Sequence, residues 1–300
     1  MPAETLWLKP HDRRRNAQQD PALLRWSLIA VAVALVGILV IVPVVNVFAQ
    51  AFGAGIGGYW RNLTADADTR HAIILTLLVA PVAVAANVLF GIAAAWAITK
   101  FRFPGRTLLT TLIDLPFAVS PVVVGLTFML LFGRQGYFGP WLRDYGLQIV
   151  FAWPGIVLAT MFVTVPFVAR ELIPVMEAIG SDEETAAVSL GASGWQVFWR
   201  VTLPNIKWGL LYGVILCNAR AMGEYGAVYV VSGHIAGQTD TMPLRVEKLF
   251  QEYNNPGSFA VASVLTFLAL VTLAIKVVLE HKTRQEIESA TAADAEQVSE

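Results

Sequence analysis

Charged residues are scarce in this sequence. Only 14% of the 300 residues are Asp, Glu, Lys or Arg, whereas 56% are hydrophobic. Soluble domains carry charge on about a quarter of their residues, so the deficit argues against a soluble domain and indicates a chain that lies largely in lipid. The formal net charge of −1 adds little, because here the distribution of the charges matters more than their sum.

Cysteine is also rare, and the histidines are not clustered. The single cysteine, Cys217, excludes an internal disulfide and a thiolate metal cluster. The four histidines lie far apart and share no ligand spacing, so we expect no metal site. A phosphate-binding P-loop needs Gly-Lys followed by Ser or Thr, and none of the six lysines follows a glycine. We therefore expect no nucleotide or other cofactor bound by this chain.

Long apolar runs are what the sequence has instead. A hydrocarbon core about 30 Å thick needs roughly 20 apolar residues of helix. Six stretches meet this need, at about 24–50, 70–99, 107–132, 151–173, 208–232 and 258–279. The first is too long for the apolar part of a signal peptide, so we interpret it as an uncleaved span. The third contains Asp114, Pro116 and Pro121, and we expect a kink there.

The lysines and arginines predict the orientation of the spans. Fourteen fall on the side that holds both termini and the polar stretch 174–207, and six fall on the other side. Because cytoplasmic loops carry the excess of positive charge, we expect both termini and this stretch to be cytoplasmic. The polar ends, 1–22 and 283–300, are expected to be disordered cytoplasmic tails, which leaves a helical domain at 23–282.

The polar stretch contains the most informative pattern, SDEETAAVSLGASGWQVFWRVTLPNI at 181–206. It predicts two short helices joined at Gly191, a residue suited to the left-handed conformation at a helix end. Each helix is preceded by a capping-box pattern. The two patterns are Ser181 with Glu184 and Ser193 with Gln196.

The second of these helices is expected to present a concentrated apolar surface. Its apolar side chains are Trp195, Phe198, Trp199 and Val201. Pro204 is expected to end the helix and to force Leu203 out of the helical region. An exposed patch of this kind usually marks a partner site, but tryptophan is also common at membrane interfaces. From the residues alone, both interpretations stay open.

The spacing in this stretch resembles a known signature. Ala186-Ala187, three residues, Gly191, nine residues and Val201-Thr202-Leu203-Pro204 are similar to the EAA loop of binding-protein-dependent ABC importer permeases. In that family the loop, here 175–207, includes a coupling helix that docks on a separate ATPase subunit. The resemblance assigns this role to Glu184, Ala186, Ala187, Gly191, Ser193, Trp195, Phe198, Val201, Leu203 and Pro204. Thr185 stands at the family's glutamate position, directly after Glu183 and Glu184.

Polar residues inside the predicted spans mark a transport route or hold helices together. Arg220 and Glu224 lie four residues apart in the fifth span, so they share one helix face and can pair. We interpret them as a pair that holds helices in register, with Arg220 switching between Glu224 and a passing anion as the alternative. Asp114 is either a third partner or a residue at the membrane interface. Ser120 and Asn218 are predicted to line a polar path.

Three longer segments resemble a narrower family. DLPFAVSPVVVGL at 114–126, LGASGWQVFWRVTLPNIKWGLLYG at 190–213 and NARAMGEYGAVYVVSG at 218–233 are similar to sulfate/thiosulfate permeases of the CysW type. Molybdate permeases share the Gly-Glu-aromatic-Gly step at 223–226, so molybdate, tungstate or another oxyanion stays open as the substrate. The resemblance implies the six-helix permease fold of type I ABC importers, with its core at 69–280, in the bacterial inner membrane.

The same resemblance implies partners. They are a sister permease that forms a heterodimer, two ATPase subunits that use the ATP, and a periplasmic sulfate-binding protein. The binding protein would contact the segments 51–69, 133–150 and 233–257. The chain itself would be a non-catalytic subunit.

Two other classes of protein are alternatives to an importer permease. The EAA spacing argues against an autonomous channel or secondary transporter. A polytopic enzyme would need a catalytic cluster, and the sequence contains no His-Glu-x-x-His, no Gly-x-Ser-x-Gly and no paired intramembrane aspartates.

Overall fold

The computed structural model describes the backbone of residues 22–299 and the side chains of residues 23–279. Every regular element in these ranges is a helix, which confirms the prediction of an all-α protein. The disorder predicted for the N-terminal tail falls on residues 1–21, which lie outside the described part of the chain. The described chain divides into two units, one ending at Ala49 and one beginning at Gln50.

Within the described residues, four helices are long and apolar enough to cross a membrane. They correspond to the first, second, fourth and sixth predicted spans. These helices are α2 (Ala22–Ala51), α4 (Ala67–Lys100), α8 (Trp153–Ile179) and the Asn255–Leu279 part of α14 (Asn255–Ser299). The described part of the first unit, residues 22–49, lies in α2, and the other three helices belong to the second unit.

The third predicted span is broken rather than kinked. It consists of α5 (Arg106–Ala118) and α6 (Pro121–Phe132), which are bent by 108° relative to each other. Val119 and Ser120 between them have extended ψ angles of 132° and 131°. A residue before proline avoids the helical region, whereas proline itself fits the first turn of a new helix. Pro121 therefore starts a second helix, and the bent pair counts as one candidate span.

The fifth predicted span, at 208–232, is interrupted in this structure. α11 (Leu203–Met222) ends before Gly223, and a separate short helix, α12 (Gly226–Ser232), follows. The carboxylate of Glu224 accepts a hydrogen bond from the N–H of Ala227 at 3.0 Å, and so supports the start of the new helix. The described residues thus contain four candidate spans, or five with the bent pair, instead of the six that were predicted.

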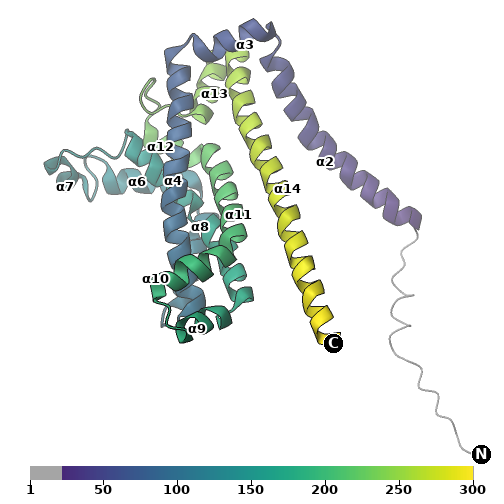
Figure 1. The fold of residues 1–300 in the computed structure, drawn as a ribbon. Helices are drawn as coiled ribbons and strands as arrows, with labels where there is room; N and C mark the ends of the chain where they lie inside the picture. The colour runs from purple at the N-terminus through teal and green to yellow at the C-terminus, as the bar shows by residue number, and fades with distance from the viewer. Residues whose placement is uncertain (1–21, 300) are drawn as a thin grey trace, which may run out of the picture. The chain divides into compact units, whose positions relative to one another are not determined.

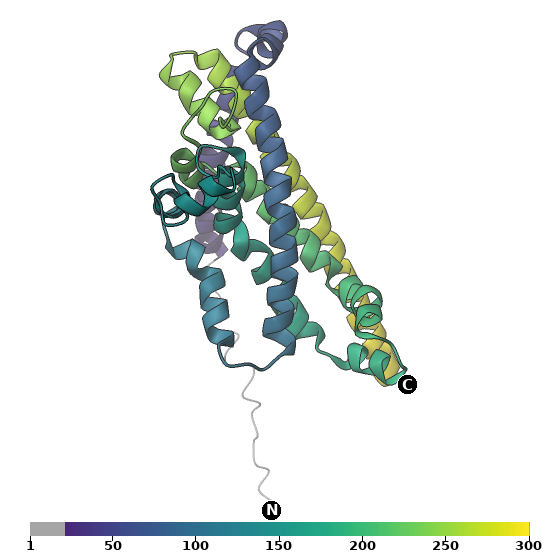
Figure 2. The same ribbon diagram turned by 90° about the vertical axis from the view of Figure 1, so that its left-hand side faces the viewer.

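The centre of the second unit is a bundle of α4, α8 and α11, and α14 packs against α11 (Figures 1 and 2). Val168, Leu172, Ile206 and Cys217 form its buried core, each at most 1% exposed. Glycine permits the close approach of α4 and α8, because a Cβ on Gly91 would lie 2.7 Å from a methyl group of Val168.

The bundle has two distinct ends, which Figure 1 separates clearly. At the first, called the α3–α13 end, lie α3 (Gly55–Thr64), α13 (Met242–Gln251) and the start of α4. At the second, called the α9–α10 end, lie α9 (Asp182–Ser189), α10 (Gly194–Val197) and a π-helical turn, η1 (Phe198–Thr202). A short helix, α7 (Gly139–Asp144), follows α6 at the side of the bundle.

α14 continues as a helix to Ser299, although the segment 283–300 was expected to be disordered. The segment contains several alanines, glutamates and glutamines, which are strong helix formers. Its composition therefore allows the backbone of the preceding span to continue in helical conformation.

Candidate functional site

Two short helices form the loop at the α9–α10 end, as the sequence predicts. Gly191 connects them with a φ of +87°, the left-handed conformation expected of a glycine after a helix. The capping box of Ser193 and Gln196 is present, with the Ser193 N–H donating to Gln196 Oε1 at 2.8 Å and the Gln196 N–H donating to Ser193 Oγ at 3.4 Å. The turn is therefore built from local sequence.

The capping box predicted for Ser181 and Glu184 is wrong, because Glu184 is engaged elsewhere. The Ser181 side chain makes no capping hydrogen bond. The two carboxylate oxygens of Glu184 instead lie 2.9 Å from Lys100 Nζ and 2.7 Å from Thr202 Oγ1. The Lys100 ammonium group and the Thr202 hydroxyl group thus bind the Glu184 carboxylate. This carboxylate is therefore not available to cap the start of α9.

The expectation for Pro204 is also wrong. Leu203 is helical, with φ −65° and ψ −42°, and α10 continues through η1 into α11. Pro204 lies in the first turn of α11. A proline has no N–H to donate, and here it lies just after the π-helical turn η1, where the hydrogen-bond pattern already departs from that of an α-helix. The helical stretch therefore continues through Pro204 instead of ending before it.

The aromatic side chains of the loop divide between the bundle and solvent. Phe198 is half-buried and stacks on Trp96 of α4, with ring centroids 5.1 Å apart. Trp195 and Trp199 remain 70% and 51% exposed, and Leu190 in the turn is 90% exposed. The structure thus places Phe198 against the bundle and leaves an exposed apolar surface of Leu190, Trp195 and Trp199 at this end of the bundle.

The remaining residues assigned to this loop lie along the same end. Ala187, Val201 and Leu203 are half-buried, whereas Ala186 and Pro204 are exposed. No residue of this group is buried in the bundle core.

The ion pair predicted in the fifth span is present, but not on a continuous helix. Arg220 Nη1 lies 2.6 Å from Glu224 Oε2. The Glu224 side chain is only 1% exposed, whereas that of Arg220 is 35% exposed. Since α11 ends at Met222, Glu224 lies in the break between α11 and α12. The ion pair therefore links the end of α11 to the break, and Arg220 is the more accessible of its two side chains.

Asp114 is not a third member of that pair. Its carboxylate lies 3.0 Å from the guanidinium Nε of Arg170 on α8. The same guanidinium lies over the ring of Phe117, at 5.4 Å from its centroid. The structure thus assigns Asp114 to the contact between α5 and α8.

Two helix breaks lie next to each other in the bundle. Gly226, the first residue of α12, lies close to Pro121, the first residue of α6, since an added Cβ would be 3.0 Å from the proline ring. Ser120 in the first break is exposed, and Glu224 lies in the second. Asn218 on α11 is half-buried and makes no side-chain hydrogen bond to any described residue. Polar groups therefore gather where the two predicted spans are interrupted.

Sequence reasoning did not identify a buried amide in the bundle core. Asn87 of α4 is fully buried and donates to Thr164 Oγ1 at 2.8 Å and to the carbonyl of Met161 at 3.1 Å, both on α8. It also lies 3.7 Å from the sulfur of Cys217 on α11. A single asparagine in the middle of an apolar run was the available signal.

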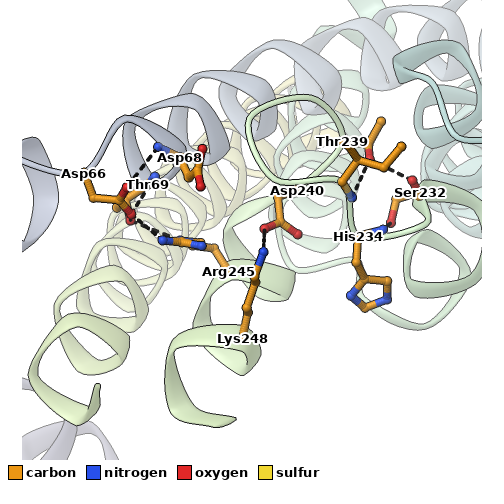
Figure 3. A network of polar contacts seen from close by, with 10 residues as sticks. Asp66, Asp68, Thr69, Ser232, His234, Thr239, Asp240, Arg245 and Lys248 are labelled. Carbon is orange, nitrogen blue, oxygen red and sulfur yellow. Dashed lines mark hydrogen bonds and ion pairs between the residues drawn. The ribbon is translucent and has the colours of Figure 1, made fainter. Parts of the chain in front are cut away.

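A polar network at the α3–α13 end was also not identified from the sequence (Figure 3). Asp66 caps α4 by accepting the N–H groups of Asp68 and Thr69, and it pairs with the buried Arg245 of α13. Burial pushes the pKa of Asp66 up, but the Thr69 hydroxyl and the charge of Arg245 outweigh that effect and hold it below its ordinary value. The network ties α13 to the start of α4.

Asp240 lies in the same region, shortly before α13 (Figure 3). Its side chain is fully buried, and neither carboxylate oxygen has a hydrogen bond among the described residues. The nearest cation, Lys248 Nζ, is 3.9 Å away. Burial raises the pKa of Asp240 above its ordinary value, although the charges of Lys248, Arg245 and His234 act in the opposite direction.

Comparisons with known proteins agree with the loop signature. Two curated relatives come from Escherichia coli (strain K12). The sulfate transport system permease protein CysW is 54% identical over 258 residues, which cover 86% of this chain and 88% of that protein. The sulfate transport system permease protein CysT is 41% identical over 215 residues, or 72% of this chain and 77% of that protein.

A solved structure has the same fold. It is a bacterial alginate ABC transporter in complex with an alginate pentasaccharide-bound periplasmic protein. The TM-score is 0.68 at 19% identity, over 88% of this chain and 94% of the matched chain. Residues 87–285, about two thirds of this chain, match the family described as binding-protein-dependent transport system inner membrane component. Together, the match, the EAA spacing and the fold show that the chain belongs to this family of ABC importer permeases.

Proposed function

We propose that this chain is the permease subunit of an ABC importer for sulfate or thiosulfate, and that it receives the force of ATP hydrolysis through the loop at its α9–α10 end. The observation that carries the proposal is the exposed apolar surface of Leu190, Trp195 and Trp199, held by the left-handed turn at Gly191. The sulfate specificity is supported by the names of the curated relatives.

The proposed topology places the α9–α10 end in the cytoplasm of a bacterium and the α3–α13 end in the periplasm. Six crossings of the inner membrane result if α5 with α6 and α11 with α12 each count as one interrupted crossing. The positive charge of the short loops supports this orientation. Broken helices are tolerated at membrane depth where they are buried in protein or line a cavity.

Three kinds of partner complete the proposed importer. An ATPase subunit docks on the loop at the α9–α10 end, and a binding protein delivers the anion at the α3–α13 end. A sister permease forms the other half of the route, as two different sulfate transport permease proteins of one organism both resemble this chain. Because this chain contains no P-loop, ATP is used by the ATPase subunits.

The anion is proposed to pass the place where the two helix breaks meet. Ser120 lies in the first break, and Arg220 faces the second with about a third of its side chain accessible. Because Glu224 neutralises the Arg220 guanidinium, this group should bind a passing dianion only weakly. Weak binding suits a transport route, since the anion must also be released.

A pair of substitutions at Gly191 tests the docking role. A Cβ at this position meets no other atom of this chain, so within the chain a substitution acts through backbone strain alone. Valine tolerates φ +87° poorly and asparagine tolerates it well. In a strain that carries the whole importer, we expect Gly191→Val to lower labelled sulfate uptake about tenfold, in line with a strain of 1–3 kcal/mol. Gly191→Asn should retain uptake.

Co-purification of the ATPase subunit and competition by unlabelled anions complete this test. We expect Gly191→Val to lose ATPase during purification while the chain stays in the membrane. Thiosulfate and molybdate competitors then identify which oxyanions share the route. Gradient-driven sulfate uptake by this chain alone in liposomes, without ATP, would contradict the proposal and would favour an autonomous channel or transporter.

A further inference from the structure

The ammonium group of Lys100 is a meeting point of several elements at the α9–α10 end. Lys100 is the last residue of α4. Its Nζ lies 2.9 Å from Glu184 Oε2 on α9 and donates a hydrogen bond to the carbonyl of Gly180, the residue after α8. The Lys100 side chain thus connects the end of its own helix, α4, with the end of α8 and with α9, the first helix of the loop.

Glu184 extends this contact into the second half of the loop. Its other oxygen accepts a hydrogen bond from Thr202 Oγ1, and Thr202 in η1 is only 3% exposed. The neighbouring Glu183 accepts a hydrogen bond from the amide of Asn205 in the first turn of α11. The carboxylates of Glu183 and Glu184 therefore bind α9 to η1 and α11, which follow the exposed turn in the chain.

Burial makes the Lys100–Glu184 pair a stronger connection than an ordinary surface pair. The two side chains are only 13% and 19% exposed. Breaking a buried pair leaves an uncompensated charge, whereas exposed pairs contribute little. Arg106 and Glu177 provide a direct comparison, because they also lie 2.9 Å apart at this end but are 43% and 51% exposed. That second pair joins α5 to α8 and includes no residue of the loop helices.

We propose that Lys100 is the positioning residue that makes the docking loop move as one body with α4 and α8. The inference rests on the proposed function. It also gives a role to Glu184, which stands one position before the glutamate of the EAA pattern. Force applied to the exposed surface of the loop reaches the bundle along the chain, into α8 and α11, and through side-chain contacts, of which the Phe198–Trp96 stack and the Lys100–Glu184 bond both end on α4. Among the described residues, the Lys100–Glu184 bond is the ion pair that joins α9 directly to α4.

The test uses the complete reconstituted importer with its binding protein and compares sulfate transported with ATP hydrolysed. We expect Lys100→Met to lower the transport-to-hydrolysis ratio about tenfold, which lies within the usual range of coupling between sites. The matched variant Arg106→Met should keep the wild-type ratio. Lys100→Arg should also keep it, since the positive charge remains.

A charge exchange separates coupling from folding. Lys100→Glu alone and Glu184→Lys alone should each lose coupling, and the double variant should recover at least a third of the wild-type ratio. Co-purification of the ATPase and the melting temperature of the complex show that each variant assembles. Wild-type coupling in Lys100→Met, or an exchange that fails to recover any coupling although the complex assembles, would overturn the inference. Wild-type complex without ATP-dependent sulfate uptake would instead contradict the proposed function itself.

Discussion

Glu224 divides its carboxylate between the guanidinium of Arg220, at 2.6 Å, and the backbone N–H of Ala227, at 3.0 Å. The same group therefore neutralises a cation at the end of α11 and supports the start of α12. Because the side chain is almost fully buried, its charge depends on Arg220 for compensation. These two contacts of Glu224 therefore hold the end of α11 and the start of α12 in a fixed arrangement.

The cost of an uncompensated charge can be measured at this pair. Arg220→Met should destabilise the complex by about 3–5 kcal/mol, because it leaves the Glu224 carboxylate buried without a cation. The double variant with Glu224→Gln should recover most of this loss, since glutamine has no charge and its carbonyl can still accept the Ala227 N–H. Thermal melting of the purified complex measures both. Equal destabilisation by the single and double variants would show that the two residues act independently.

Close packing of α6 against α12 leads to a second prediction. A Cβ on Gly125 would lie 2.7 Å from the carbonyl oxygen of Ala227 and 2.8 Å from Val230. Since a backbone atom gives way poorly, Gly125→Ala should destabilise the complex by about 1–3 kcal/mol. Gly57→Ala in α3 is the control, because its Cβ meets open space in a helix. The control should be neutral or more stable than wild type by up to about 1 kcal/mol.

The carboxylate of Asp66 should stabilise the α3–α13 end above its ordinary pKa. Its pKa is lowered in the folded chain, so this stability is present above pH 3.8 and is lost as the pH falls through the folded value. Asp66→Asn keeps an acceptor for the N–H groups of α4 but removes the charge that faces the buried Arg245. We expect a loss of about 1 kcal/mol at neutral pH, because the Asp66 side chain is 42% exposed and solvent screens its charge. Melting curves at several pH values should show the two proteins converge in acid, and a pH-independent difference would contradict the argument.

Asp240 should behave in the opposite way. Its pKa is raised, so the stability that the neutral carboxyl group contributes is complete below pH 3.8 and is lost as the pH rises through the folded pKa. Lys248, Arg245 and His234 reduce this loss, and Asp68 adds to it. We therefore expect Asp240→Asn to melt at a higher temperature than wild type at neutral pH, with the difference vanishing in acid. A lower melting temperature at neutral pH would show that the ionised group is stabilising.

Local patterns in the sequence determined much of this protein. Apolar runs of membrane length identified all four of the long spans, because a helix in lipid must satisfy its backbone within one segment. The turn at Gly191 and the capping box at Ser193 followed from a few neighbouring residues. The Arg220–Glu224 pair followed from a spacing of four. Each of these depends on chain positions that are close together.

The tertiary structure decided what depends on distant residues. Glu184 does not form the expected capping box, because its carboxylate binds Lys100 and Thr202. Asp114 pairs with Arg170 of another helix. The contact between Asp66 and Arg245 joins positions 179 residues apart. Helix periodicity and capping patterns extend over a turn or two, so they carry no information about which helices pack together. Only the packing of α5 on α8, of α13 on the start of α4, and of α9 and η1 at the end of α4 brings these side chains within bonding distance.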